Sequence, residues 1–169
     1  MRVKGSLGEV VKDFSHIKDI FIRKEEGKVI IEAYFADRKT YSLINTIASK
    51  IKNMITGVLR GYRYKMKIVY AHFPMSVKVD KNQGVIVIEN FLGRRDKIKV
   101  KMLPNTNVKV QGDEVIIEGV DVEAVSQTAA NLREATKLRG KFRLSPHGRE
   151  GGPGVLDGIY VYAKETIEE

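Results

Sequence analysis

The four residues Val-Ile-Ile-Glu occur twice in this chain, at 29–32 and at 115–118, separated by about half of its 169 residues. A Leu-Gly pair precedes each copy at nearly the same distance, as Leu7-Gly8 and as Leu92-Gly93. Self-similarity at a fixed spacing indicates a repeated architecture. The chain is therefore predicted to consist of two similar units that arose by internal duplication.

The second half shows apolar residues at alternate positions, as expected for strands with one buried face. The alternating segments are 75–79, 85–89, 98–102, 108–110, 115–117 and 159–163. Asn82-Gln83-Gly84 marks a hairpin turn between the first two. Asp121 is suited to cap a helix over 122–138, which Gly140 would end.

The first half repeats this plan with fewer strands. Its predicted strands are 10–14, 20–22, 29–31 and 64–70, and its predicted helix is 42–59. When the two Leu-Gly pairs are aligned, nothing in the first half corresponds to the strand 75–79. The first sheet is therefore expected to have one strand fewer, or to borrow one.

Strands in succession with one helix near the end of each unit predict an α+β fold. We expect two similar domains, each an antiparallel β-sheet with one helix packed on a face. The boundary is placed at the stiff connection His72-Phe73-Pro74, which gives an N-terminal domain 1–72, one strand short, and a C-terminal domain 73–169.

The charge of the chain favours a polyanionic partner. Thirty Lys and Arg residues against 21 Asp and Glu give a net charge of +9, which suits phosphate neutralisation with counterion release. Residues 1–72 hold 15 basic and 7 acidic side chains, including Arg60, Arg63, Lys65 and Lys67. Between 133 and 150, six basic side chains stand against two acidic ones. For any one of these basic clusters, the alternative to a binding surface is a solvated surface that only keeps the protein soluble.

Several classes of protein are disfavoured by what the sequence lacks. It contains no apolar run of membrane-spanning length, no signal-peptide core and no cysteine, so a cytoplasmic location is expected. His16, His72 and His147 have no partners at metal-ligand or catalytic-triad spacing. Neither a metal, a cofactor nor an enzymatic activity is predicted.

A glycine-rich segment at 144–154 separates the second helix from the last strand. It lacks the Lys-Ser or Lys-Thr of a phosphate-binding P-loop. Gly148-Arg149-Glu150-Gly151 has the spelling of a GxxG clamp, but Pro146 and Pro153 occupy places where helices would be needed. Two interpretations of this segment stay open. It is either a loop whose backbone approaches RNA phosphates or a surface insertion without a role.

Five segments of the chain closely resemble one protein family. They are NMITGV at 53–58 with Gly61-Tyr62, VYAHFPM at 69–75, VIENFLG at 87–93, QTAAN at 127–131 and DGIYV at 157–161. The chain resembles the L-six family of large-subunit ribosomal proteins, in its archaeal and eukaryotic form. The resemblance implies two duplicated α+β domains and a structural role on large-subunit rRNA, near the sarcin–ricin loop and the region where translation factors bind. Neighbouring ribosomal proteins are implied as further partners.

In that family the C-terminal domain makes the main rRNA contacts. The residues expected to bind rRNA here are Lys137, Arg139, Lys141, Arg143, His147, Arg149 and Lys164. A secondary basic surface is expected at Arg60, Arg63, Lys65 and Lys67.

The chain departs from the family in two places. It lacks the usual additional N-terminal strand and hairpin, and the longer glycine-rich segment replaces the short basic approach to Asp157-Gly158. An RNA chaperone or regulator acting outside the ribosome is the alternative function. A nucleotide-dependent enzyme using 148–154 is a second rival.

Overall fold

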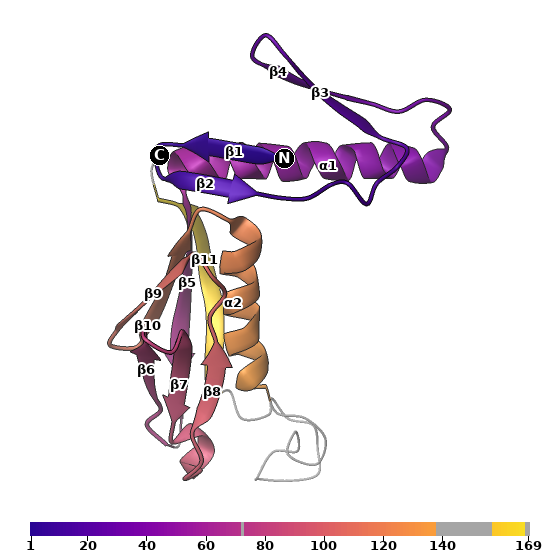
Figure 1. The fold of residues 1–169 in the computed structure, drawn as a ribbon. Helices are drawn as coiled ribbons and strands as arrows, with labels where there is room; N and C mark the ends of the chain where they lie inside the picture. Colours follow the sequence, from indigo (N-terminus) through magenta and orange to yellow (C-terminus); the bar gives the residue numbers. More distant parts are fainter. Residues whose placement is uncertain (72, 138–156, 168–169) are drawn as a thin grey trace.

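A long helix with two hairpins on it forms the N-terminal unit of the computed structural model, which describes residues 1–71, 73–137 and 157–167. The hairpins are β1 (Arg2–Gly5) with β2 (Gly8–Val11), and β3 (Phe21–Glu25) with β4 (Lys28–Glu32). Each is a separate two-stranded antiparallel sheet. Figure 1 shows both along α1, with β3–β4 standing off the helix.

Helix α1 (Arg38–Arg60) starts earlier than the predicted 42–59. The reason is its cap: the backbone N–H of Thr40 donates to the Asp37 side chain at 2.8 Å, which satisfies a free N–H of the first turn. Ile47, Ile51, Met54 and Val58 lie along its buried face. Two small clusters result, one under each hairpin.

The C-terminal unit holds one four-stranded and one three-stranded antiparallel sheet, with α2 (Val122–Ala135) packed against them. The first sheet has the order β11-β5-β10-β9, with β5 (Tyr62–Val69), β9 (Thr106–Gln111), β10 (Glu114–Gly119) and β11 (Gly158–Thr166). The second has the order β6-β7-β8, with β6 (Ser76–Asp80), β7 (Val85–Glu89) and β8 (Ile98–Lys101). A short 3-10 turn, η1 (Phe91–Gly93), follows β7.

One large core lies between these sheets and α2. Ile86, Ile88, Ile117, Leu132 and Ile159 are fully buried in it. As predicted, Asp121 caps α2, because its side chain accepts from the Glu123 N–H at 3.0 Å. The helix ends at Ala135, earlier than predicted, and the expected terminating residue Gly140 lies outside the described residues.

The predicted boundary at 72 assigned residues 62–69 to the N-terminal domain, whereas in the structure β5 pairs within the C-terminal sheet. Tyr62–Val69 pairs antiparallel with β10 on one side and with β11 on the other. The repeat suggested that β5, which follows α1, is the last strand of the first unit, just as β11, which follows α2, is the last strand of the second. Instead the two closing strands pair with each other, so the units meet at Gly61, between α1 and β5.

The two units are held together by ion pairs and by close packing. The Lys12 ammonium lies 3.1 Å from the Asp121 carboxylate and 2.6 Å from that of Glu123. Gly57 of α1 packs directly on the Val120 carbonyl oxygen, where any side chain would collide with it. The junction therefore involves direct contact between the helix of one unit and the helix start of the other.

Candidate nucleic-acid interface

The residues predicted to bind rRNA are only partly within the described structure. The Lys137 ammonium, just after α2, lies 3.1 Å from the Glu134 carboxylate. Lys164, on β11, lies 5.4 Å from the centre of the Tyr64 ring. Arg139, Lys141, Arg143, His147 and Arg149 lie outside the described residues. Lys137 and Lys164 are on different elements and each has an intramolecular contact.

The secondary basic surface is largely neutralised by carboxylates. Arg63 and Lys65 lie on one face of β5, where Arg63 donates to Glu118 at 2.8 Å and Lys65 donates to Glu165 at 3.0 Å. Lys67 is exposed on the same face, opposite Glu114 in the β5–β10 register. Arg60, at the end of α1, is exposed. These four residues therefore offer less free positive charge for binding phosphate than the sequence alone suggests.

Glu118 is the centre of this neutralised face. It also accepts from the Lys109 ammonium at 2.9 Å, and its side chain is only 14% exposed. Burial alone would raise the pKa of this carboxyl, but hydrogen bonds from Lys109 and Arg63 prevail and lower it. Glu118 thus stays ionised and holds two cations in place.

A different basic surface lies on the outer side of the three-stranded sheet. We call it the lysine face, and it consists of Lys78, Lys97, Lys99 and Lys101. The β6–β7–β8 register places Lys78, Lys99 and the edge residue Lys101 on the side opposite the buried Ile86, Ile88 and Val100. All four lysines are exposed.

One carboxylate orders two of these lysines. Glu89 lies 2.7 Å from the Lys78 ammonium and 2.8 Å from that of Lys97. Hydrogen bonds from Lys78 and then Lys97 lower the pKa of Glu89 to about 2. Asp80 lies on the same face, so four positive charges stand against two negative ones, and the net positive surface is suited to binding phosphate oxygens.

The lysine face was missed in the sequence analysis, although a signal exists. Lys97, Lys99 and Lys101 alternate with Ile98 and Val100, and in a strand alternate residues share a face. Density along the sequence instead favoured the basic run at 133–150, in which no alternation defines a common face.

The Asp-Gly-Ile-Tyr sequence at 157–160 has structural roles at each position. The buried Asp157 accepts from the Ala71 N–H at 2.7 Å, which ties the start of β11 to the end of β5. A side chain at Gly158 would press on the Tyr160 ring and on Thr136. Ile159 is fully buried, and the Arg133 guanidinium stacks 4.2 Å from the Tyr160 ring centre.

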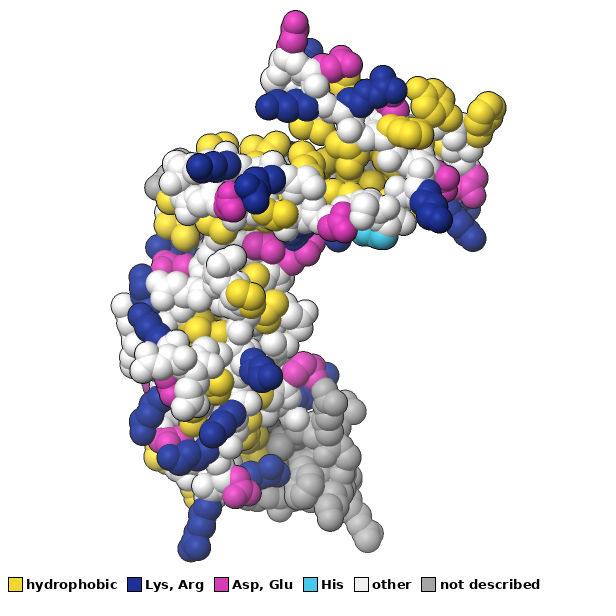
Figure 2. Space-filling model, viewed as in Figure 1, with side chains coloured by type: hydrophobic (Ala, Val, Ile, Leu, Met, Phe, Trp, Pro, Cys, Tyr) yellow, Lys and Arg dark blue, Asp and Glu magenta, His cyan; other side chains and the backbone are white. Residues whose placement is uncertain are grey.

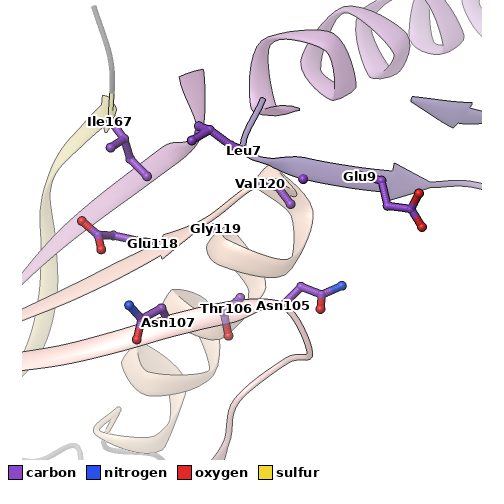
Figure 3. Close-up of a pocket in the computed structure, with 11 residues that line it drawn as sticks. Leu7, Glu9, Asn105, Thr106, Asn107, Glu118, Gly119, Val120 and Ile167 are labelled. Atoms are coloured by element: carbon purple, nitrogen blue, oxygen red, sulfur yellow. The ribbon is translucent and has the colours of Figure 1, made fainter. Parts of the chain in front are cut away.

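A cavity of about 690 Å³ lies where the two units meet (Figure 3). Apolar side chains of Leu7, Val120 and Ile167 line it together with polar ones. Its two carboxylates, Glu9 and Glu118, lie apart and point in different directions (Figure 3). Across residues 1–71, 73–137 and 157–167, no group of three or more potential metal ligands is found. The cavity offers no paired acid and base for catalysis.

The fold and these surfaces define a class of protein: a duplicated α+β scaffold with exposed basic faces. A sequence model of the family described as ribosomal protein L6 matches residues 1–61 and 73–142, and the chain belongs to this family. The gap between the two matched segments contains β5, the strand that joins the units.

Curated relatives agree over nearly the whole chain. Those named large ribosomal subunit protein uL6 include one from Ignicoccus hospitalis, 50% identical over 99% of this chain and 86% of the relative. Others are from Pyrobaculum aerophilum, 48% identical over 99% and 85%, and Methanobrevibacter smithii, 44% identical over 96% and 85%. The family and its archaeal type are confirmed, and the family is structural and non-enzymatic, as predicted.

No helix in the described part of the chain combines the length and apolarity needed to cross a membrane.

Proposed function

We propose that this protein is a structural constituent of the large ribosomal subunit, located in the cytoplasm with the ribosome. Its near-full-length similarity to relatives named for that subunit, up to 50% identity, carries the proposal. The finer proposal is that it binds large-subunit rRNA near the sarcin–ricin loop, beside the region where translation factors bind. Neighbouring large-subunit proteins would be its other contacts.

The C-terminal unit supplies the main RNA contacts in this proposal. The predicted residues Lys137, Arg139, Lys141, Arg143, His147, Arg149 and Lys164 contribute on the basis of their charge. The lysine face adds four exposed ammonium groups that the sequence analysis had not included. Lysine and arginine contacts to phosphate position a protein on RNA without reading its bases.

The N-terminal unit and β5 supply a weaker electrostatic contribution. Arg60 and Lys67 are the exposed members of the predicted secondary surface, whereas Arg63 and Lys65 are held by carboxylates. We propose that this side meets neighbouring RNA or an approaching translation factor through Arg60 and Lys67.

Binding to an rRNA fragment that contains the sarcin–ricin loop tests the RNA part of the proposal. We expect log K to fall steeply with log salt, with a slope reduced by about 1 for each phosphate contact removed. Arg139→Glu with Lys141→Glu tests the predicted run, and Lys99→Glu with Lys101→Glu tests the lysine face. Lys24→Glu with Lys28→Glu, on the β3–β4 hairpin, is the charge-matched control.

A flat salt dependence, or equal losses for all three double variants, would contradict the proposed surface. Sedimentation of a cell lysate tests the ribosomal assignment separately. A ribosomal constituent travels with the large subunit, whereas an RNA chaperone or regulator acting outside the ribosome stays in the light fractions.

A further inference from the structure

The connection between β4 and α1 is longer than its counterpart in the C-terminal unit. In the first unit, Asp37 caps the helix five residues after Glu32. In the second, Asp121 does so three residues after Glu118. The first unit therefore has two more residues here than the fold requires. The added stretch, 33–36, lies at the end of α1 that is remote from the C-terminal unit (Figure 1).

This stretch brings aromatic side chains to the surface. Tyr34 is 61% exposed and Phe35 is fully exposed, and Tyr41, on the first turn of α1, is 65% exposed. The Tyr34 ring meets the Phe21 ring of β3 edge to face, with the ring centres 5.7 Å apart. We call these four residues the aromatic tip. Figure 2 shows apolar side chains on the surface at the end of the N-terminal unit where α1 begins.

The hairpin strand contributes to the aromatic tip from its outer side. Phe21 alternates in β3 with Ile22, which packs on the cluster formed with α1, so Phe21 points away from the helix. When the two Val-Ile-Ile-Glu segments are aligned, Phe21 falls on the exposed Asn107 of β9, and Ile22 falls on the buried Val108. The position faces solvent in both units, and the first unit has an aromatic ring there.

The backbone at Phe35 has an unfavourable conformation for its side chain. Its φ of 55° lies in the left-handed region, which bulky residues rarely adopt. Because the ring is fully exposed, no burial of apolar surface offsets this conformation. Backbone strain of this kind is concentrated at functional sites. Phe35 is therefore a candidate for a binding role and not for a folding role.

The first turn of α1 carries cations at the end of the helix dipole that disfavours them. Arg38 and Lys39 are exposed, and within the described residues neither forms an ion pair. The first turn of α2, in contrast, contains the acidic Glu123. The carboxylates of Asp37 and Glu32 are engaged, one in the helix cap and one in an ion pair with β3. The free charge beside the aromatic tip is therefore positive.

We propose that the aromatic tip stacks on unpaired bases of RNA, and that Arg38 and Lys39 bind the phosphates that link those bases. Exposed aromatic rings beside cations hold single-stranded nucleic acid, because every base presents a face for stacking. An apolar protein surface would desolvate the two cations without supplying acceptors. The site rests on the proposed function only in that RNA is its partner, and it is separate from the lysine face.

Two short oligonucleotides separate stacking from phosphate binding. One is an oligoadenylate, and the other is an abasic strand of the same length and charge. NMR of the full chain follows the rings of Tyr34 and Phe35 together with the amides of the lysine face. We expect the oligoadenylate to shift both rings upfield and the abasic strand to leave them nearly unchanged, because it has no base to stack. The lysine face should respond to both strands through their phosphates.

Substitutions of Phe35 test the stacking itself, because loss of a fully exposed ring leaves no cavity. Phe35→Leu keeps apolar surface and should weaken oligoadenylate binding about tenfold, measured at the Tyr34 ring. Phe35→Trp keeps an aromatic face and should bind within about twofold of the unchanged protein. Tyr162→Ala removes an exposed ring on β11 and serves as the control, for which we expect no effect.

Two further variants separate binding from folding. Asparagine adopts positive φ more readily than phenylalanine, so Phe35→Asn should raise Tm by about 1–2 °C while it loses the binding. Arg38→Gln with Lys39→Gln should flatten the salt dependence of oligoadenylate binding. Lys24→Gln with Lys28→Gln, near the turn of the β3–β4 hairpin, is the charge-matched control and should leave it unchanged.

Ring shifts of equal size with the abasic strand would overturn the proposed stacking, as would the absence of ring shifts with both strands. Unchanged affinity of Phe35→Leu would also overturn it and would indicate an apolar protein partner. A lysine face that still responds when the rings do not would leave the proposed rRNA contacts intact. Ring shifts with oligoadenylate while the lysine face responds to neither strand would show the reverse.

Discussion

The two Val-Ile-Ile-Glu segments have the same residues and very different environments. In β10, Val115 and Ile117 are fully buried, whereas in β4 Val29 is 37% exposed and Ile31 is only half-buried. The difference comes from their neighbours. β10 is flanked by β9 and β5, while within the described residues β4 pairs only with β3. Burial is therefore set by which strands are adjacent, and not by the segment itself.

The carboxylates that end the two segments differ in the same way. Glu118 accepts hydrogen bonds from Arg63 and Lys109, on the two strands that flank it. In the described part of the chain, the one ionic neighbour of Glu32 is the Arg23 guanidinium at 3.6 Å, beyond hydrogen-bonding distance. Glu118 lies on an internal strand of its sheet, between β5 and β9.

Truncation of the matched isoleucines should give the largest contrast. Ile117→Ala is expected to lower the free energy of unfolding by about 3–4 kcal/mol, because it leaves a cavity in a closed core. Ile31→Ala should cost about 1–2 kcal/mol, since its surroundings are partly solvated. Urea unfolding of both variants measures the difference. Equal losses would show that the two cores are equally closed.

Neutralising the matched glutamates should give a smaller contrast. Glu118→Gln is expected to cost about 1–2 kcal/mol, because it leaves Arg63 and Lys109 without their charged acceptor. Glu32→Gln should change stability by less than about 0.5 kcal/mol. A double-mutant cycle of Glu118→Gln with Lys109→Met measures the coupling, and no coupling would contradict the role assigned to Glu118.

The helix caps offer a comparison in which the units should be nearly equal. Asp37→Ala and Asp121→Ala each remove a side chain that accepts from the first turn of its helix, so both variants should be less stable, Asp121→Ala by about 1 kcal/mol. Asp121→Ala should cost slightly more, since Asp121 also pairs with Lys12 across the junction. Thermal unfolding of both variants, with Asp37→Asn and Asp121→Asn as controls that preserve capping, checks this.

The smallest effect concerns the lysine face and pH. Because the pKa of Glu89 is lowered to about 2 by Lys78 and Lys97, its ion pairs contribute fully above its ordinary pKa of 4.5. The contribution is lost as pH falls from there through about 2. Lys78→Met with Lys97→Met should return the Glu89 pKa toward its ordinary value. NMR titration of the side-chain carboxyl measures the shift, and an unchanged pKa would exclude the two lysines as its cause.

The sequence predicted much of the fold because its signals were local. Alternation located β6 to β10, and Asp121 located the start of α2. The sequence did not indicate that β5 pairs with β10 and β11, because strand pairing over long range is not encoded in periodicity.

The candidate site was harder to predict because net charge does not reveal which cations are already paired. Arg63 and Lys65 lie in a basic run of the sequence, but in the structure each forms an ion pair with a glutamate. The lysine face arises from β6 and β8, which are separated along the chain and meet only through β7. Such a surface appears once the register is known.

The position of β5 also determines the order in which the chain can fold. This strand is synthesised before both of its neighbours in the sheet, and the ion pair between Lys65 and Glu165 spans 100 residues. Until β10 and β11 emerge, β5 presents two unpaired edges and the apolar side chains of Met66 and Ile68. We expect the C-terminal unit to complete its folding in one late and slow step, after the last strand has been made.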